Sequence, residues 1–150
     1  MRRALMRGGI VVCLTALVLC TVDGAWAKGG RDFAASYQFA NVSESNGEVE
    51  VTITLNLRNN SGANISDASV VLLNSDANPT VLGLFGDPQS LQKSGLNTMS
   101  HTFTVPKAEY QLWEEGRDPA LRVVSADPSG AMRMQGIDLQ RRVAGVRAMK

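Results

Sequence analysis

Residues 48–58 read EVEVTITLNLR, and apolar residues occupy every second position from Val49 to Leu57. Successive side chains of a β-strand point to opposite sides of the sheet, so this period of two predicts a strand that is buried on one face only. Antiparallel sheets commonly have one buried and one solvated face, whereas parallel sheets are covered on both. The stretch therefore predicts an antiparallel β-sandwich.

Six other segments have the apolar, β-branched or alternating composition of strands, namely 33–39, 68–73, 81–85, 98–105, 121–126 and 131–139. Turn-forming residues separate them, and 41–47 is expected to be a hairpin turn. Residues 106–115 are expected to form the one short helical turn. The sequence thus predicts a single all-β sandwich of about seven strands. Its expected core residues are Val49, Val51, Ile53, Leu55, Leu57, Val71, Phe103, Val105 and Leu121.

Three pieces of this pattern resemble the immunoglobulin-like and fibronectin-type-III-like β-sandwiches of exported bacterial proteins. They are the alternating strand, the turn Asn59-Asn60-Ser61-Gly62 that leads into Val70 and Val71, and the strand end Phe103-Thr104-Val105-Pro106. The resemblance implies one domain over residues 28–140. It concerns the fold, and a fold does not by itself define a function.

The N-terminus has the composition of a secretory signal peptide. Arg2, Arg3 and Arg7 precede an apolar run over 10–22, and Ala25-Trp26-Ala27 offers the small residues that signal peptidase requires. We expect cleavage after residue 27, which removes both cysteines, so that the mature chain begins at Lys28. The sequence therefore predicts an exported protein, periplasmic or extracellular, that is stabilised without disulfides.

Composition excludes several classes of protein. The chain of 150 residues has 44% hydrophobic and 19% charged residues and a formal net charge of +1, which rules out disordered and collagenous chains. Charge is unevenly spread, because residues 28–128 carry seven basic and 12 acidic side chains while 129–150 carry five basic and one acidic. An acidic body on an exported chain argues against a nucleic-acid partner.

The basic C-terminal tail, residues 141–150, is the first candidate binding element. Arg141, Arg142 and Arg147 are expected to give weak, salt-sensitive contact with anionic envelope material, and at most a peripheral contact with a membrane. The alternative is a solvated tail that binds nothing.

The aromatic residues Tyr110 and Trp113 form the second candidate. They lie three positions apart in the expected helical turn, where they could offer a stacking platform for a sugar ring. The alternative is an aromatic plug that fills the end of the sandwich, as sandwiches often have.

A third candidate is a copper site. Met99 and His101 share one face of an expected strand, and Met132 and Met134 share one face of another. Thioether and imidazole ligands suit Cu(I), so the four side chains would form a soft metal site if the two faces met. The alternative is that the methionines fill gaps in the core, which would leave the protein without a metal or any other cofactor.

Reactive side chains are scarce. His101 is the single imidazole, and Ser100 beside it points to the opposite face of the strand. The acidic residues Glu114, Glu115 and Asp118 fall in one loop with no second carboxylate placed opposite. We therefore expect a non-catalytic binding or structural module of the cell envelope, whose partner is another envelope protein or a polysaccharide. A small carrier of a ligand or of copper is the alternative.

N-terminal sequencing of the protein recovered from the envelope or the medium tests the export prediction. We expect Lys28 as the first residue, because the peptidase reads the small residues at Ala25 and Ala27. Recovery of a chain that still begins with Met1 would contradict it.

Overall fold

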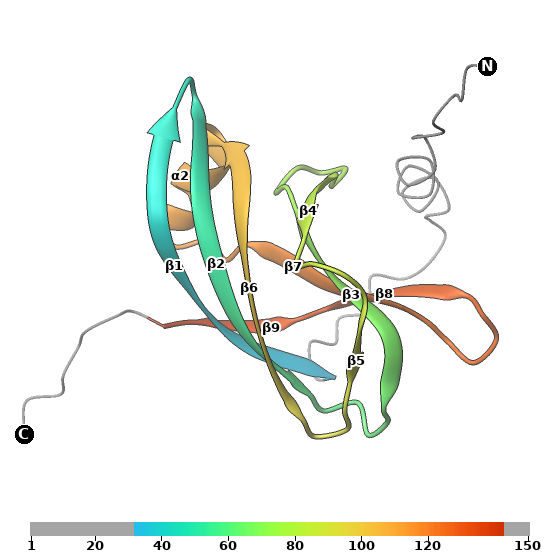
Figure 1. The fold of residues 1–150 in the computed structure, drawn as a ribbon. Coiled ribbons are helices and arrows are strands. Elements are labelled where there is room, and N and C mark those ends of the chain that lie inside the picture. Colours follow the sequence, from blue (N-terminus) through green and yellow to red (C-terminus); the bar gives the residue numbers. More distant parts are fainter. Residues whose placement is uncertain (1–31, 143–150) are drawn as a thin grey trace, which may run out of the picture.

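The computed structural model describes residues 32–142 and contains, within this range, nine strands and one helix (Figure 1). The predicted signal peptide, its cleavage site and Arg147 lie outside the described residues. The elements are β1 (Phe33–Ser45), β2 (Glu48–Asn59), β3 (Ile65–Leu73), β4 (Val81–Leu84), β5 (Gln89–Leu91), β6 (Leu96–Pro106), α2 (Lys107–Glu114), β7 (Ala120–Ala126), β8 (Met132–Gly136) and β9 (Asp138–Arg141).

The strands form two sheets that enclose the core, as a β-sandwich does. The first sheet has the strand order β6-β2-β1-β9, and the second has β4-β3-β7-β8 with β5 paired to β3. All strand pairs are antiparallel except β1 with β9. The predicted all-β sandwich is therefore confirmed.

Strand β2 has the predicted division between its two faces. Val49, Val51, Ile53, Leu55 and Leu57 are each at most 2% exposed, whereas the residues between them face outward. β2 pairs over almost its whole length with β1 on one side and β6 on the other, so this buried row lies in the middle of its sheet. Phe103, Val105 and Leu121 join the same core, as expected.

Val71 was expected in the core and is only 5% exposed, but it does not face the central core. It is buried, but in a separate small cluster with Leu73 and Val124, while Val70 and Leu72 face the main core. The run from Val70 to Leu73 is apolar at every position. Such a strand carries no alternation that would tell its inner face from its outer face.

The hairpin turn at 41–47 is shorter than predicted. β1 continues to Ser45, and the turn itself consists of Asn46 and Gly47, both with positive φ (53° and 79°). Asparagine followed by glycine is the pair that a two-residue hairpin turn favours, because both residues tolerate positive φ. Asn41, also at positive φ (50°), lies in a β-bulge between Ala40 and Ser43 that lets the strand continue.

Residues 131–139, expected as one strand, are divided between two. β8 pairs antiparallel with β7 in the second sheet, and β9 pairs parallel with β1 in the first. Ile137, which is 8% exposed, joins them and packs in the core where the chain crosses between the sheets. β9 ends at Arg141, so the sandwich includes one residue of the expected tail. This division and the three-residue β5 account for the two strands beyond seven.

Helix α2 matches the predicted helical turn closely. Pro106 is its N-cap and Glu115 its C-cap, against the expected range 106–115. It lies behind β1, β2 and β6 at one end of the sandwich (Figure 1). Proline ends β6 there because it has no N–H to donate, and its fixed φ suits the start of a helix.

Truncation of the central row should destabilise the protein strongly. Leu55→Ala removes a side chain that is 0% exposed, and we expect a loss of about 2–5 kcal/mol in the free energy of unfolding. Leu96→Ala is the matched control, because Leu96 is 66% exposed and its loss should change that free energy by less than about 0.5 kcal/mol. Equal denaturation midpoints for the two variants would contradict this account of the core.

Candidate functional site

Trp113, a candidate stacking residue, lies entirely inside the protein. It is 0% exposed, and its ring stacks on Phe39 of β1 with centroids 5.6 Å apart. A ring without exposed surface cannot hold a sugar, so the prediction of a stacking platform at Trp113 is wrong. The alternative, an aromatic plug between the sheets, is what the structure contains.

A buried carboxylate holds this plug in position. Glu109 is 7% exposed and accepts hydrogen bonds from the Trp113 indole Nε1 (3.2 Å), the Ser75 backbone N–H (3.1 Å) and the Ser75 hydroxyl (2.6 Å). Ser75 follows β3, so the carboxylate ties α2 to the second sheet. This role of Glu109 could not be predicted from the sequence, because Ser75 and Glu109 are 34 residues apart.

Tyr110 is half-buried beside the plug. Its ring lies 6.0 Å from that of Trp113 and 5.9 Å from that of Phe39. Burial raises the pKa of the Tyr110 hydroxyl, nearby Glu114 raises it further, and Arg141 opposes the shift. Tyr110 therefore remains partly accessible, but its contacts are those of a packed aromatic cluster.

Tyr37 belongs to the same aromatic cluster, and it forms a hydrogen bond with one of the candidate acidic residues. Its hydroxyl donates to Asp118 Oδ1 at 2.7 Å. Burial raises the pKa of Tyr37, and the hydrogen bond to the Asp118 carboxylate raises it further. Glu114 and Glu115 are exposed.

Arg141 was expected in the basic tail as a binding residue, and the structure instead places it at the end of β9, where its side chain contacts α2 and β1. Its Nη1 donates to the backbone oxygen of Trp113 at 3.0 Å, and its guanidinium lies 5.0 Å from the centre of the Phe39 ring. The last turn of α2 has no basic residue, so Arg141 supplies from β9 the positive charge that favours a helix C-terminus. Arg141 and Arg142 are both exposed, but Arg142 donates only its backbone N–H, to Tyr37.

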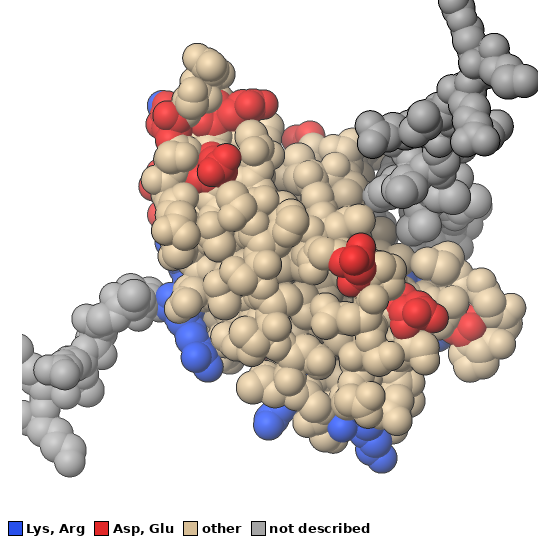
Figure 2. Space-filling view, viewed as in Figure 1, with Lys and Arg blue, Asp and Glu red and all other residues tan. Residues whose placement is uncertain are grey.

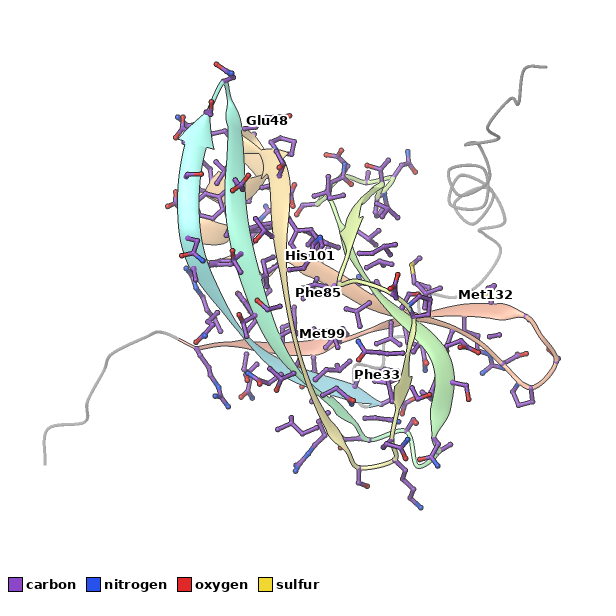
Figure 3. All side chains as sticks on the ribbon, in the orientation of Figure 1. Phe33, Glu48, Phe85, Met99, His101 and Met132 are labelled. Atoms are coloured by element: carbon purple, nitrogen blue, oxygen red, sulfur yellow. The ribbon has the colours of Figure 1, made fainter. Side chains whose placement is uncertain are left out.

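The four candidate copper ligands do not come together. Met99 and His101 lie on β6, which is an edge strand of the first sheet and contacts β4, one edge of the second sheet. Met132 and Met134 lie on β8, which is the opposite edge of the second sheet from β4. Figure 3 shows Met132 well away from Met99 and His101. Met99 is 7% exposed, whereas Met132 is 53% exposed. These four side chains therefore do not form the copper site that was the alternative interpretation of the sequence.

His101 packs against an aromatic neighbour. Its ring meets that of Phe103 edge-on at 4.9 Å, and its partner across the β2 ladder is Ile53. Over residues 32–142, no group of three or more His, Cys, Asp or Glu side chains could hold a metal ion. The same residues include no helix of the length and hydropathy that crossing a bilayer takes.

A surface that sequence reasoning passed over lies on the outer side of the first sheet. Nine of the outward residues in its middle carry hydroxyl or amide groups, and we call them the hydroxyl–amide face: Ser36, Gln38, Thr52, Thr54, Asn56, Thr98, Ser100, Thr102 and Gln140. Ala40, which is paired with Thr52, lies among them. Strand register brings them together from four strands. In the sequence they read only as the solvated positions of separate strands.

The new role of Arg141 predicts different effects for two neighbouring arginines. Arg141→Gln should lower the free energy of unfolding by about 1–2 kcal/mol, because a charged hydrogen bond and a cation–π contact are lost. Arg142→Gln keeps its backbone hydrogen bond and should change that free energy by less than about 0.5 kcal/mol. Urea denaturation of both variants measures this, and equal losses would refute the helix-capping role.

Comparison with protein families and with curated proteins gives no match. Among solved structures, the chain is similar to two chains of a GH20 exo β-N-acetylglucosaminidase from Vibrio harveyi, one in complex with N-acetylglucosamine and one an inactive mutant. Identities are 10% and 11%, the TM-score is 0.41 in both cases, and the matches cover 79% and 76% of this chain. The chain spans 19% of the length of each enzyme chain. A likeness at this TM-score assigns no function.

Proposed function

We propose that the protein is an exported, non-catalytic binding or structural module of the cell envelope, built on an immunoglobulin-like or fibronectin-type-III-like sandwich. The N-terminal leader composition supports export to the periplasm or beyond. The absence of cysteine after residue 27 fits a domain that relies on its core rather than on disulfides.

One observation carries the non-catalytic part of the proposal. Three of the charged side chains that chemistry could use are bonded to framework partners: Glu109 to Ser75 and Trp113, Asp118 to Tyr37, and Arg141 to the end of α2. General acid–base catalysis needs such groups beside a substrate instead. His101, the single imidazole of the chain, is exposed and lies edge-on to Phe103, and no second reactive side chain is bonded to it in the described residues.

The partner we propose is another envelope protein or a polysaccharide. Acidic side chains gather near the tip of the β1–β2 hairpin, at the top of Figure 2, where Glu44, Glu48 and Glu50 lie. This charge argues against nucleic acid as the partner. Arg142 offers a second mode of attachment, which is a weak and peripheral contact with anionic surfaces. We propose that Arg147, which lies beyond the described residues, shares this contact.

Envelope pull-downs at two salt concentrations test this function. We expect the full chain to sediment with isolated envelopes, and the double variant Arg142→Gln, Arg147→Gln to lose only the fraction that high salt also removes, because exposed charges are screened beyond about 8 Å at physiological salt. Arg141 is left intact because its replacement would disturb α2. Recovery of the protein in the cytosol, or release of sugar from envelopes that disappears in His101→Ala, would overturn the proposal.

A further inference from the structure

The hydroxyl–amide face is a continuous surface. Across the sheet, Asn56 of β2 is paired with Thr98 of β6 and Ser36 of β1, and Ser36 is paired with Gln140 of β9. The next row joins Thr54 to Ser100 and Gln38. Neighbouring strands lie about 4.8 Å apart, so hydrogen-bonding groups recur at short, regular intervals over four strands.

The middle of this face carries no charge. Glu50 bounds it toward the hairpin tip, and Arg58 and Asp138 bound it at the other end. The exposed Arg142, whose backbone N–H donates to Tyr37, follows the end of β9 at the β9 margin. In Figure 2, acidic side chains cluster at the tip of the hairpin and basic ones lie at the left and lower margins, with uncharged surface between them. Typical protein surfaces are about 25–35% charged, so a block of nine neutral residues is a distinctive feature.

Cross-strand hydrogen bonds fix the orientation of these groups. Thr52 and Thr102 hydroxyls lie 2.8 Å apart, Thr54 and Ser100 hydroxyls 3.1 Å apart, and Thr98 Oγ1 donates to Asn56 Oδ1 at 2.8 Å. A hydroxyl pair shares one proton, so each pair keeps one free O–H donor and spare lone pairs. The Asn56 amide likewise keeps its two N–H donors. The face therefore offers donors and acceptors that are already positioned for a ligand.

We infer that the hydroxyl–amide face binds a neutral polysaccharide chain laid across β6, β2 and β1. This inference rests on the proposed binding function and names its site and ligand class. A neutral polymer rich in hydroxyls matches an uncharged surface with mixed donors and acceptors, whereas a charged polymer would find no counter-charge there. Protein interfaces are enriched in aromatic residues, Met and Arg, and none of the nine residues is of those types.

Paired substitutions of opposite charge at the centre of the face test the inference. Thr54→Glu and Thr54→Lys both place a charge among the neutral groups, so both should weaken retention on amorphous cellulose and insoluble mannan by about fivefold or more. Thr80→Glu and Thr80→Lys are the matched controls, because Thr80 is an exposed threonine beside the second sheet. These two substitutions should leave retention on both polymers unchanged. Circular dichroism verifies that all four variants are folded.

A second variant removes hydroxyls without adding charge. Thr52→Val with Thr102→Val keeps two β-branched residues in their strands and should weaken retention by a similar factor. The full chain should bind the neutral polymers equally at low and high salt and should not be retained on alginate, which is anionic.

Several results would overturn the inference. The first is that the full chain is not retained on either neutral polymer, and the second is that both Thr54 variants are retained as well as the full chain. The third is that the Glu and Lys substitutions have opposite effects on retention, which would indicate an electrostatic ligand. If the protein binds the envelope through another surface, it should still sediment with envelopes in each of these three cases. If the protein does not sediment with envelopes at all, the proposed binding function itself is wrong.

Discussion

The burial of one row of β2 side chains is the constraint on which the rest of the structure depends. β2 pairs with both β1 and β6, and its inner row is almost inaccessible to water. Burial of each such aliphatic side chain contributes about 1.5–3 kcal/mol, which without disulfides is the main source of stability available to this domain. The outer row of the same strand must then be polar. The core and the hydroxyl–amide face are therefore two sides of one strand.

Closure of the sandwich at one end depends on a different interaction. An open end would leave Phe39 and the inner surfaces of both sheets in water, and α2 covers them with Trp113. This brings the Glu109 carboxylate out of water, which costs free energy unless the group is hydrogen-bonded. Ser75 and the indole N–H provide those bonds, and Arg141 adds a charged donor to the Trp113 carbonyl oxygen, which also accepts from a backbone N–H. Several side chains that look functional in the sequence are used here to hold three elements together.

The crossing at Ile137 connects these two features. It carries the chain from β8 in the second sheet to β9 in the first, where β9 lies parallel to β1. Because of this crossing, Leu139 packs against the core and Arg141 reaches α2, while Gln140 extends the neutral outer surface. A short strand thus contributes both to the plug and to the proposed binding face.

The sequence by itself determined seven strand-forming segments, the helical turn and most of the core, but not β5 or the division of 131–139 into β8 and β9. Alternation from Val49 to Leu57, the Asn46-Gly47 pair and Pro106 are local signals, and each acts through the conformation of its own segment. The face of Val71 was not determined, because a run of apolar residues has no period. The burial of Trp113, the capping by Arg141 and the separation of Met99 from Met132 were decided by the tertiary structure alone. The same holds for the hydroxyl–amide face, since its nine residues come from four strands and become one surface only when strand register places them side by side.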